Sequence, residues 1–165
     1  DFRAAERTFQ MVTQVAGRAG RSGAGGQVVV QSLAGLSAAL QFAANHVYPS
    51  FAAHELASRK RLGWPPFTRL ALVRSAAHQR ADAIGFLEFA QQALLAHCSE
   101  TLRVLGPVDA PMARKAGRHR AQLLLQSSDR PALHMALREL RVTLEQSPAA
   151  RKVRWSIDVD PIELF

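Results

Sequence analysis

Apolar residues near the start of the chain recur at helical spacing. Phe9, Val12 and Ala16 lie three to four residues apart, with polar residues on the other faces. This period predicts a helix over 4–15, because such residues share one face of a helix. A glycine follows this run, so we expect the helix to end at Gly17.

A glycine-rich loop and a short β-branched run come next. The loop is predicted over 18–26, and the run QVVVQS over 27–32 predicts a strand buried on both faces. Helix, loop and strand in this order indicate that residues 1–33 are an α/β fragment.

Residues 34–65 have the pattern of a helical connector. Leu36, Leu40 and Ala43 form one helical stripe, and Pro49 then interrupts the pattern. We therefore expect two helices in this connector, separated at the proline.

The second of these helices is predicted over 51–62. It ends in Arg-Lys-Arg before Gly63, and cations suit the negative end of a helix. The next residues, GWPPF over 63–67, exclude helix because two prolines are adjacent. We place a domain border there, so that a second domain covers 66–165.

The second domain alternates between strand and helix periodicity. Its order is β-α-β-β-α-β, which is that of a split β-α-β, ferredoxin-like sheet packed on two helices, an α+β domain. The predicted strands are 68–75, 102–108, 119–127 and 151–161, the helices are 80–97 and 133–144, and a basic loop covers 111–117.

The candidate core residues of this domain are apolar and recur at the period of their element. Asp129 is a plausible N-cap, with Pro131 in the first helical turn. The expected inward residues are Ile84, Leu87, Ala90, Leu94, Leu123 to Leu125, Leu133, Leu137, Leu140, Leu144, Val153, Trp155, Ile157 and Val159.

Composition limits the classes of protein that need to be considered. The chain has 165 residues, an ordinary 48% hydrophobic content and no apolar run near the roughly 20 residues of a membrane span. Cys98 is the single cysteine, so an internal disulfide and a cysteine-rich zinc site are excluded; we expect it to be a small buried residue on a helix. The chain lacks an initiator methionine and a signal-peptide pattern, and we interpret it as part of a longer protein.

The net charge of +8 comes from basic residues that are nearly all arginine, which favours a polyanionic partner. A basic surface without a specific partner is the alternative. Charge alone does not separate the two.

One motif in the first domain has a specific chemical use. Gln14-x-x-Gly17-Arg18-Ala19-Gly20-Arg21 places two guanidiniums three residues apart. Two such groups can converge on one phosphate, since the planar fork of arginine makes two parallel charge-assisted bonds to phosphate oxygens. An arginine offered to the γ-phosphate from outside the phosphate loop would be an arginine finger.

The sequence around this motif resembles a known family. DFRAAERTFQMVTQVAGRAGR resembles the end of motif V and all of motif VI of the primosomal replication-restart DNA helicases, the PriA family of superfamily 2. The stretches ELASRKRLGWPPF, LGPVDAPMARKAGRHRAQLLLQ and RKVRWSIDVDPIELF resemble the same family in the same order. The resemblance covers essentially the whole chain.

The resemblance implies a motor enzyme of the bacterial cytoplasm. The family unwinds DNA 3′ to 5′ with ATP and Mg²⁺, recognises abandoned replication forks and begins primosome assembly. It implies that residues 1–33 end helicase lobe 2, and that Arg21, as the finger, and Arg18 face ATP together with Gln14, Gly17 and Gly20.

The resemblance also implies roles for the second domain and for partners. It implies an S10-like fold from Pro66 onward, and branched and single-stranded DNA, single-strand DNA-binding protein and other primosome proteins as partners. For Glu6 and Arg7 two roles remain possible. They could couple the ATP-bound state to the strength of DNA binding, or they could form a simple salt bridge on the helix surface.

The sequence departs from the complete family pattern in its catalytic parts. It contains no Gly-x-x-x-x-Gly-Lys-Ser/Thr phosphate loop and no recognisable Walker B carboxylate pair. The cysteine cluster that holds zinc in the family is also missing, so we expect no bound zinc. We predict that this chain alone neither hydrolyses ATP nor unwinds DNA.

The second domain carries a basic cluster without an acid among its members. Such a cluster can neutralise several phosphates, with affinity that falls as salt rises. His119 within it could stack on a base or be a polar surface residue. The predicted DNA-binding residues are Arg114, Lys115, Arg118, His119 and Arg120, and a second cluster comprises Arg151, Lys152 and Arg154.

Other residues have both a structural and a functional interpretation. Arg130 lies at a helix start, where a cation is unfavourable, and is predicted to contact an anionic partner. Asp158 and Asp160 suggest a metal or acid/base pair, but a turn or a salt bridge with Arg154 is favoured. The aromatic residues expected to be packing residues rather than base-stacking residues are Trp64, Phe67 and Trp155.

Three classes of function remain possible from the sequence. The chain is either part of a fork-restart helicase, a stand-alone nucleic-acid-binding module, or a platform that grips acidic protein tails.

Overall fold

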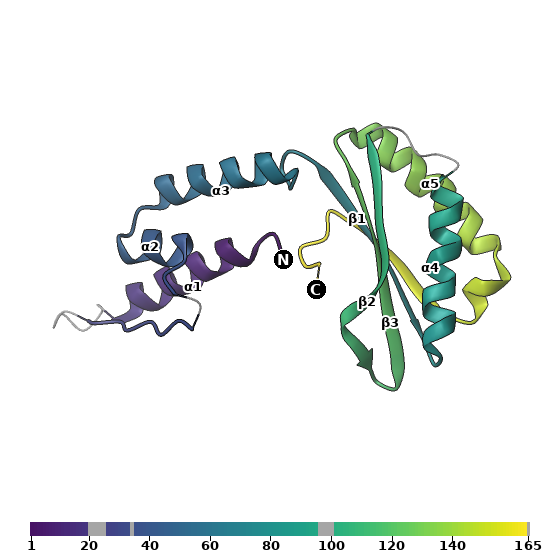
Figure 1. Ribbon diagram of the computed structural model, residues 1–165, viewed down its shortest axis with the longest axis horizontal. Helices are drawn as coiled ribbons and strands as arrows, with labels where there is room; N and C mark the ends of the chain where they lie inside the picture. The colour runs from purple at the N-terminus through teal and green to yellow at the C-terminus, as the bar shows by residue number, and fades with distance from the viewer. Residues whose placement is uncertain (20–25, 34, 96–100, 165) are drawn as a thin grey trace. The chain divides into compact units, whose positions relative to one another are not determined.

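The computed structural model describes residues 1–19, 26–33, 35–95 and 101–164 of the chain (Figure 1). It divides into two compact units, Asp1–Trp64 and Pro65–Phe165. Each unit has its own hydrophobic core.

The first unit contains three helices in its described part. They are α1, Ala4–Ala19, α2, Ala38–Ala44, and α3, Tyr48–Leu62. Their core centres on Phe9 of α1 and Phe51 of α3, whose rings are stacked with centroids 4.3 Å apart. Ala39 and Ala43 of α2 are buried in the same cluster.

The helix ends of this unit follow local rules. The Ser37 side chain accepts a hydrogen bond from the Leu40 amide and begins α2, while Pro49 lies in the first turn of α3 rather than between two helices. Gly63 ends α3 with a left-handed φ of 68°, a conformation that glycine adopts without a Cβ penalty. The predicted end of the second helix is therefore confirmed.

Three local predictions for this unit were wrong. The first helix continues beyond Gly17 to Ala19, because one exposed glycine costs a helix only about 1 kcal/mol. The segment over 27–32 is extended but is not a strand, and Val29 is 85% exposed. Leu36 was predicted to belong to the apolar stripe of the helix that is now α2, but it lies before the start of α2 and is exposed.

The failure of the predicted strand has a simple cause. A strand needs a neighbour for its backbone N–H and C=O groups, and no described strand of this unit pairs with 27–32. Among residues 1–33, the described parts, 1–19 and 26–33, are accordingly helix and extended chain, not a completed α/β layer.

The second unit contains a four-stranded antiparallel sheet of order β2-β3-β1-β4. Along the chain its elements are β1, α4, β2, β3, α5, η1 and β4. Their bounds are β1 Arg69–Ala77, α4 Arg80–Leu95, β2 Leu102–Lys115, β3 Arg118–Ser127, α5 Arg130–Gln146, η1 Pro148–Arg151 and β4 Arg154–Val159.

Both long helices of this unit cover one face of the sheet (Figure 1). The sheet contributes alternate residues to this core, such as Ala121, Leu123 and Leu125 of β3, because successive side chains of a strand point to opposite faces. Among the helix residues, Leu87 and Leu133 are fully buried. The apolar stripes predicted for α4 and α5 are confirmed, with Ile84 at the edge of the core.

The predicted cap of α5 is confirmed as well. The Asp129 carboxylate accepts a hydrogen bond from the Ala132 amide at 3.3 Å, and Pro131 lies in the first turn. The cap satisfies one of the amides that have no partner within a helix.

Three predictions for the sheet require correction. Leu124 lies on the face away from the helices, since its neighbours Leu123 and Leu125 face them. Val159 is 42% exposed. The basic loop predicted over 111–117 is instead the end of β2 followed by a tight turn.

The predicted burial of Cys98 on a helix concerns a residue that lies outside the described residues.

Candidate functional site

The β2–β3 hairpin holds all five predicted DNA-binding residues. Arg114 is paired with His119 and Lys115 with Arg118, directly across the two strands. Ala116 and Gly117 form the turn between them, with φ of 49° and 73°. Positive φ at both positions of a two-residue turn fits the right-handed twist of a hairpin.

The pleat of the strands divides this cluster between two faces. Ala121 and Leu123 of β3 face the helices, so Arg118 and Arg120 lie on the opposite, open face of the sheet. Lys115 shares that face because it is paired with Arg118. His119 and its partner Arg114 lie on the other face.

An irregularity in β2 shapes the open face beside Arg120. The register pairs Asp109 with Ala121 and then Arg114 with His119. Four residues of β2, 110–113, therefore stand opposite the single residue Arg120 of β3. Such a bulge bends its strand and redirects side chains, and the irregular end of β2 is visible in Figure 1.

This bulge borders a cavity of about 500 Å³ on the open face. Its lining combines cationic, amide and apolar side chains with residues of the C-terminal segment. They are Arg74, Ala110, Pro111, Met112, Lys115, Arg120, Gln122, Glu163 and Leu164.

The C-terminal segment is fixed to the sheet by polar contacts. Arg74 of β1 donates to the Asp158 carboxylate at 2.6 Å and to the Glu163 carbonyl oxygen at 3.0 Å. The Asp160 amide donates to the Leu70 carbonyl oxygen at 2.9 Å, and Leu164 is buried. The wall of the cavity that this segment forms is thus held in place by β1.

The cations of the hairpin are not neutralised within the described part of the chain. No described carboxylate forms a salt bridge with the side chains of Arg114, Lys115, Arg118 or Arg120. The nearby acid Asp109 is engaged elsewhere, since Arg80 donates to both of its oxygens at 2.8–3.1 Å. That hydrogen bonding lowers the pKa of Asp109.

The motif of the first unit is only partly described. Gln14 and Arg18 are both exposed on α1 and lie four residues apart, so they share one face of the helix. Arg18 is in the last helical turn, not in a loop, and no described carboxylate is paired with it. Gly17 is exposed beside it, whereas Gly20 and Arg21 lie outside the described residues.

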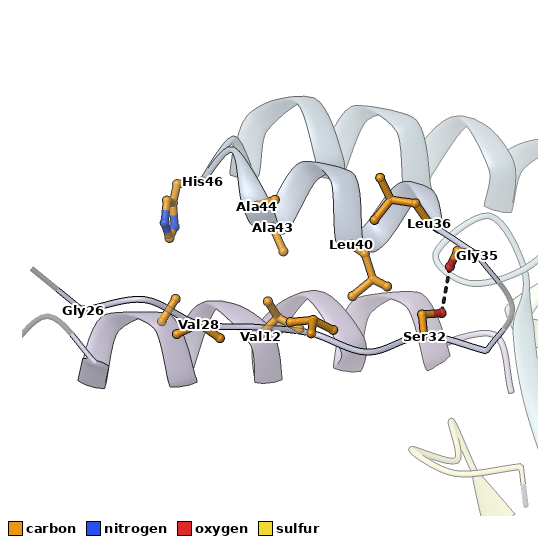
Figure 2. A pocket seen from close by; sticks show the side chains of 12 residues that line it. Val12, Gly26, Val28, Ser32, Gly35, Leu36, Leu40, Ala43, Ala44 and His46 are labelled. Atoms are coloured by element: carbon orange, nitrogen blue, oxygen red, sulfur yellow. Dashed lines mark hydrogen bonds between the residues drawn. The ribbon is translucent and has the colours of Figure 1, made fainter.

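A second cavity, of about 580 Å³, lies in the first unit. Figure 2 shows Val12 of α1, Val28 of the extended segment and Leu40 of α2 around it. Gly26 borders it, and a Cβ there would collide with the Ala19 carbonyl group. Its described lining is largely apolar and includes none of Gln14, Gly17 and Arg18.

An ion-pair network in the first unit was only partly foreseen. Arg59 of α3 donates to Glu6 of α1 at 3.0 Å and to Glu55 at 2.9 Å, and Arg3 also bonds Glu6. Arg7 pairs with Asp1 at 3.4 Å. Glu6 and Arg7 thus have structural salt-bridge partners here.

Aromatic residues extend this network. Phe2 stacks on Trp64 with centroids 5.6 Å apart, and the Arg59 guanidinium lies 5.3 Å from the Phe2 ring centroid. Trp155 packs against the core of the second unit near Phe86. The packing role predicted for Trp155 is confirmed, whereas Trp64 stacks on Phe2 of its own unit and Phe67 is 41% exposed.

Two predicted contacts of the second unit have different partners from those expected. Asp158 is paired with Arg74 rather than Arg154, since β1 and β4 place them on adjacent strands. Asp160 has a positive φ of 51° and belongs to the turn that ends β4. In the described residues no group of three or more metal-ligating side chains occurs.

The remaining cations are at the surface. Arg130 is exposed at the start of α5, and its Nε lies 3.4 Å from His134 Nε2. Arg151, Lys152 and Arg154 are exposed at the approach to β4. Among the described helices, none is long and apolar enough to cross a membrane.

The second unit is an α+β domain whose β2–β3 hairpin carries cations on the sheet face opposite α4 and α5. The chain belongs to the family of the primosomal protein N C-terminal domain, whose family model matches residues 60–162. This confirms the resemblance inferred from the sequence.

Curated relatives align with nearly the whole chain. Replication restart protein PriA of Bacillus subtilis is 34% identical over 161 residues, which cover 98% of this chain and 20% of the relative. PriA of Haemophilus influenzae is 39% identical over 165 residues, which cover 99% of this chain and 22% of the relative. PriA of Treponema pallidum is 36% identical over 167 residues, which cover 100% of this chain and 25% of the relative. The chain spans about a fifth to a quarter of the length of these relatives.

Proposed function

We propose that the chain acts in replication restart as the C-terminal part of an ATP-dependent 3′–5′ DNA helicase that recognises abandoned forks and starts primosome assembly. The main support is the similarity to replication restart proteins along the whole chain. In this proposal the helicase works in the bacterial cytoplasm, and Pro65–Phe165 is an S10-like split β-α-β-β-α-β domain.

The role of the second unit in this proposal is DNA binding through the hairpin. Lys115, Arg118 and Arg120 share one open face of the sheet, and Arg114 lies beside them on the other face. Cations without acidic partners are available to DNA phosphates, and each neutralised phosphate releases counterions. His119 would then lie at the edge of the contact.

The role of the first unit in this proposal is to complete an ATPase site. Arg18 and Arg21 would contact the phosphates of ATP–Mg²⁺ held by an upstream lobe, next to Gln14, Gly17 and Gly20. The exposure of Gln14 and Arg18 on one face of α1 supports this role. Zinc, where the intact protein holds it, would be bound outside this chain.

The proposed protein partners include single-strand DNA-binding protein and other primosome proteins. Exposed Arg130 is the proposed contact for an acidic tail. Replacement of Arg130 by Gln should weaken binding of an acidic peptide and leave fork-DNA binding unchanged, as measured by fluorescence anisotropy with each probe.

The DNA-binding proposal is tested by titrating fork DNA with this chain over a salt series. The double variant Arg118→Gln/Arg120→Gln should bind more weakly, and the slope of log affinity against log salt should fall by about 2, since each phosphate contact contributes about 0.9. The matched control is Arg138→Gln/Arg141→Gln, which makes the same charge change on exposed positions of α5. Equal losses in both double variants would reject the hairpin as the DNA-binding element.

The ATPase proposal is tested in the longer protein that carries the upstream lobe. Replacement of Arg21 by Ala should abolish DNA-stimulated ATP hydrolysis while ATP binding persists. Unchanged hydrolysis would leave the chain as a nucleic-acid-binding or protein-interaction module without a motor role.

A further inference from the structure

We infer that the cavity beside the β2 bulge binds one nucleotide unit of a single nucleic-acid strand, with its phosphate between Lys115 and Arg120. The inference rests on the proposed DNA-binding function of the hairpin. It adds a defined pocket, a ligand unit and a role for the C-terminal segment to what would otherwise be a general basic surface.

The two proposed phosphate ligands lie close together on the open face. Lys115 is paired with Arg118, and Arg120 is two residues further along β3, so Lys115 and Arg120 are diagonal neighbours across the hairpin. Diagonal neighbours on one sheet face are roughly 7–8 Å apart at the backbone, within reach of long side chains. Their charged groups can therefore approach the same phosphate, and neither has an acidic partner in the described chain.

The bulge makes room for a ligand beside these cations. Because 110–113 stand opposite Arg120 alone, β2 departs from regular pairing there, and Ala110, Pro111 and Met112 of this segment line the cavity. The resulting volume of about 500 Å³ lies within the range of about 300–1,000 Å³ that is typical of small-molecule sites. A regular hairpin would present the same cations on a flat surface.

The remaining walls suit the other parts of a nucleotide. Met112, which is 57% exposed, offers apolar surface against which a sugar or a base can pack. Gln122 lines the same cavity, and its side-chain amide has no hydrogen-bond partner in the described structure. An amide carries both donors and an acceptor, so it can bond the edge of a base.

The third cation of the cavity has a positioning role. Arg74 is occupied by Asp158 and by the carbonyl oxygen of Glu163, which hold the C-terminal segment as one wall. Glu163 also lines the cavity, and its negative charge reduces the net positive charge there. The site is therefore suited to one singly charged phosphodiester rather than to a run of carboxylates.

An acidic peptide fits these features less well. A single Asp or Glu side chain is small compared with the cavity and provides no flat base for the apolar wall. It also provides no base edge for Gln122. We therefore favour a nucleotide, and binding of an acidic peptide becomes one outcome of the test.

The methionines of the chain provide a direct test by NMR. Met112 lines the cavity, whereas Met11 and Met135 are exposed on α1 and α5 at a similar level. With ¹³C-methyl-labelled methionine, 5′-phosphorylated oligothymidylate should shift the Met112 methyl resonance and leave those of Met11 and Met135 in place. Thymidine monophosphate should shift Met112 in the same direction at higher concentration, because one unit fills the site.

Variants identify the groups that hold the phosphate. Lys115→Gln/Arg120→Gln should weaken the Met112 response at least tenfold, whereas Arg138→Gln on α5 should leave it unchanged. Lys115→Gln alone is the second variant if the double variant fails to fold, since Lys115 is exposed at the strand end. It should weaken the response several-fold.

The outcomes separate this inference from the proposed function. If fork DNA still binds but the Met112 methyl does not move, the pocket is rejected and general binding by the hairpin survives. If no DNA binds in any experiment, both are rejected. A Met112 shift produced by an acidic peptide but not by the oligonucleotide would also overturn the nucleotide assignment.

Discussion

Arg59 and Glu6 are 53 positions apart in the chain, yet the Arg59 guanidinium donates a hydrogen bond of 3.0 Å to the Glu6 carboxylate. The same guanidinium bonds Glu55 at 2.9 Å, and only 12% of the Arg59 side chain is exposed. This contact joins α1, which carries the phosphate-binding motif, to α3. A substitution of Arg59 should therefore change the stability of the first unit.

Replacement of Arg59 by Met should lower the free energy of unfolding by about 1–3 kcal/mol, because two partly buried carboxylates lose a charged partner. Urea denaturation followed by circular dichroism measures this loss. Arg61→Met is the matched control, since Arg61 is exposed in the last turn of the same helix. Equal effects of the two changes would show that the network does not stabilise the unit.

The stability due to Glu6 should depend on pH. Burial raises the pKa of Glu6, but hydrogen bonds from Arg3 and Arg59 outweigh it and leave the pKa below its ordinary value of 4.5. A depressed pKa in the folded state means that the contribution is complete above the ordinary value and is lost as the pH falls through the folded value. Wild type should thus exceed Glu6→Gln in urea midpoint at neutral pH, and the two should converge in acid. A constant difference down to low pH would contradict this.

The hairpin turn should respond in opposite directions to two substitutions. Ala116 has a positive φ that asparagine adopts more readily, so Ala116→Asn should raise the free energy of unfolding by about 0.5–1 kcal/mol. Gly117→Ala should lower it by about 1–2 kcal/mol, because the left-handed conformation then carries a Cβ. Thermal melts of the two variants test this pair, and a stabilising Gly117→Ala would show that the turn differs in solution.

The Asp129 cap should contribute to stability through its hydrogen bond rather than its charge. Asp129→Ala should cost about 1 kcal/mol, whereas Asp129→Asn, which keeps an oxygen acceptor, should cost only a few tenths. Urea denaturation of the two variants side by side distinguishes these values. If both substitutions cost the same, the interaction with the helix dipole would be the main contribution instead.

Much of the second unit could be predicted from its sequence because its signals are local. Leu133, Leu137 and Leu140 recur at helical spacing, and α5 buries all three. Asp129 marks the start of α5 by its own side-chain chemistry, as Gly63 marks the end of α3 in the first unit by its backbone. The clustering of the basic residues of the β2–β3 hairpin in one short stretch is also visible directly in the sequence.

The faces and partners of these residues could not be predicted in the same way. Lys115 and Arg120 share the open face only because the two strands adopt a particular register, with four residues of β2 opposite one of β3. Arg74 is 84 positions from Asp158, and no periodicity indicates that pair. For 27–32 the β-branched run favoured a strand, but a strand forms only where another strand offers hydrogen-bond partners.

The sequence by itself determined the helices of the second unit, their buried stripes, the N-cap of α5 and the family to which the chain belongs. Tertiary structure alone decided how the basic cluster divides between two sheet faces, how the bulge opens a cavity, and which carboxylates Arg59 and Arg74 meet. The physical reason is that periodicity and capping depend on neighbours three or four residues away. Strand register and ion pairs depend on segments that only folding brings together.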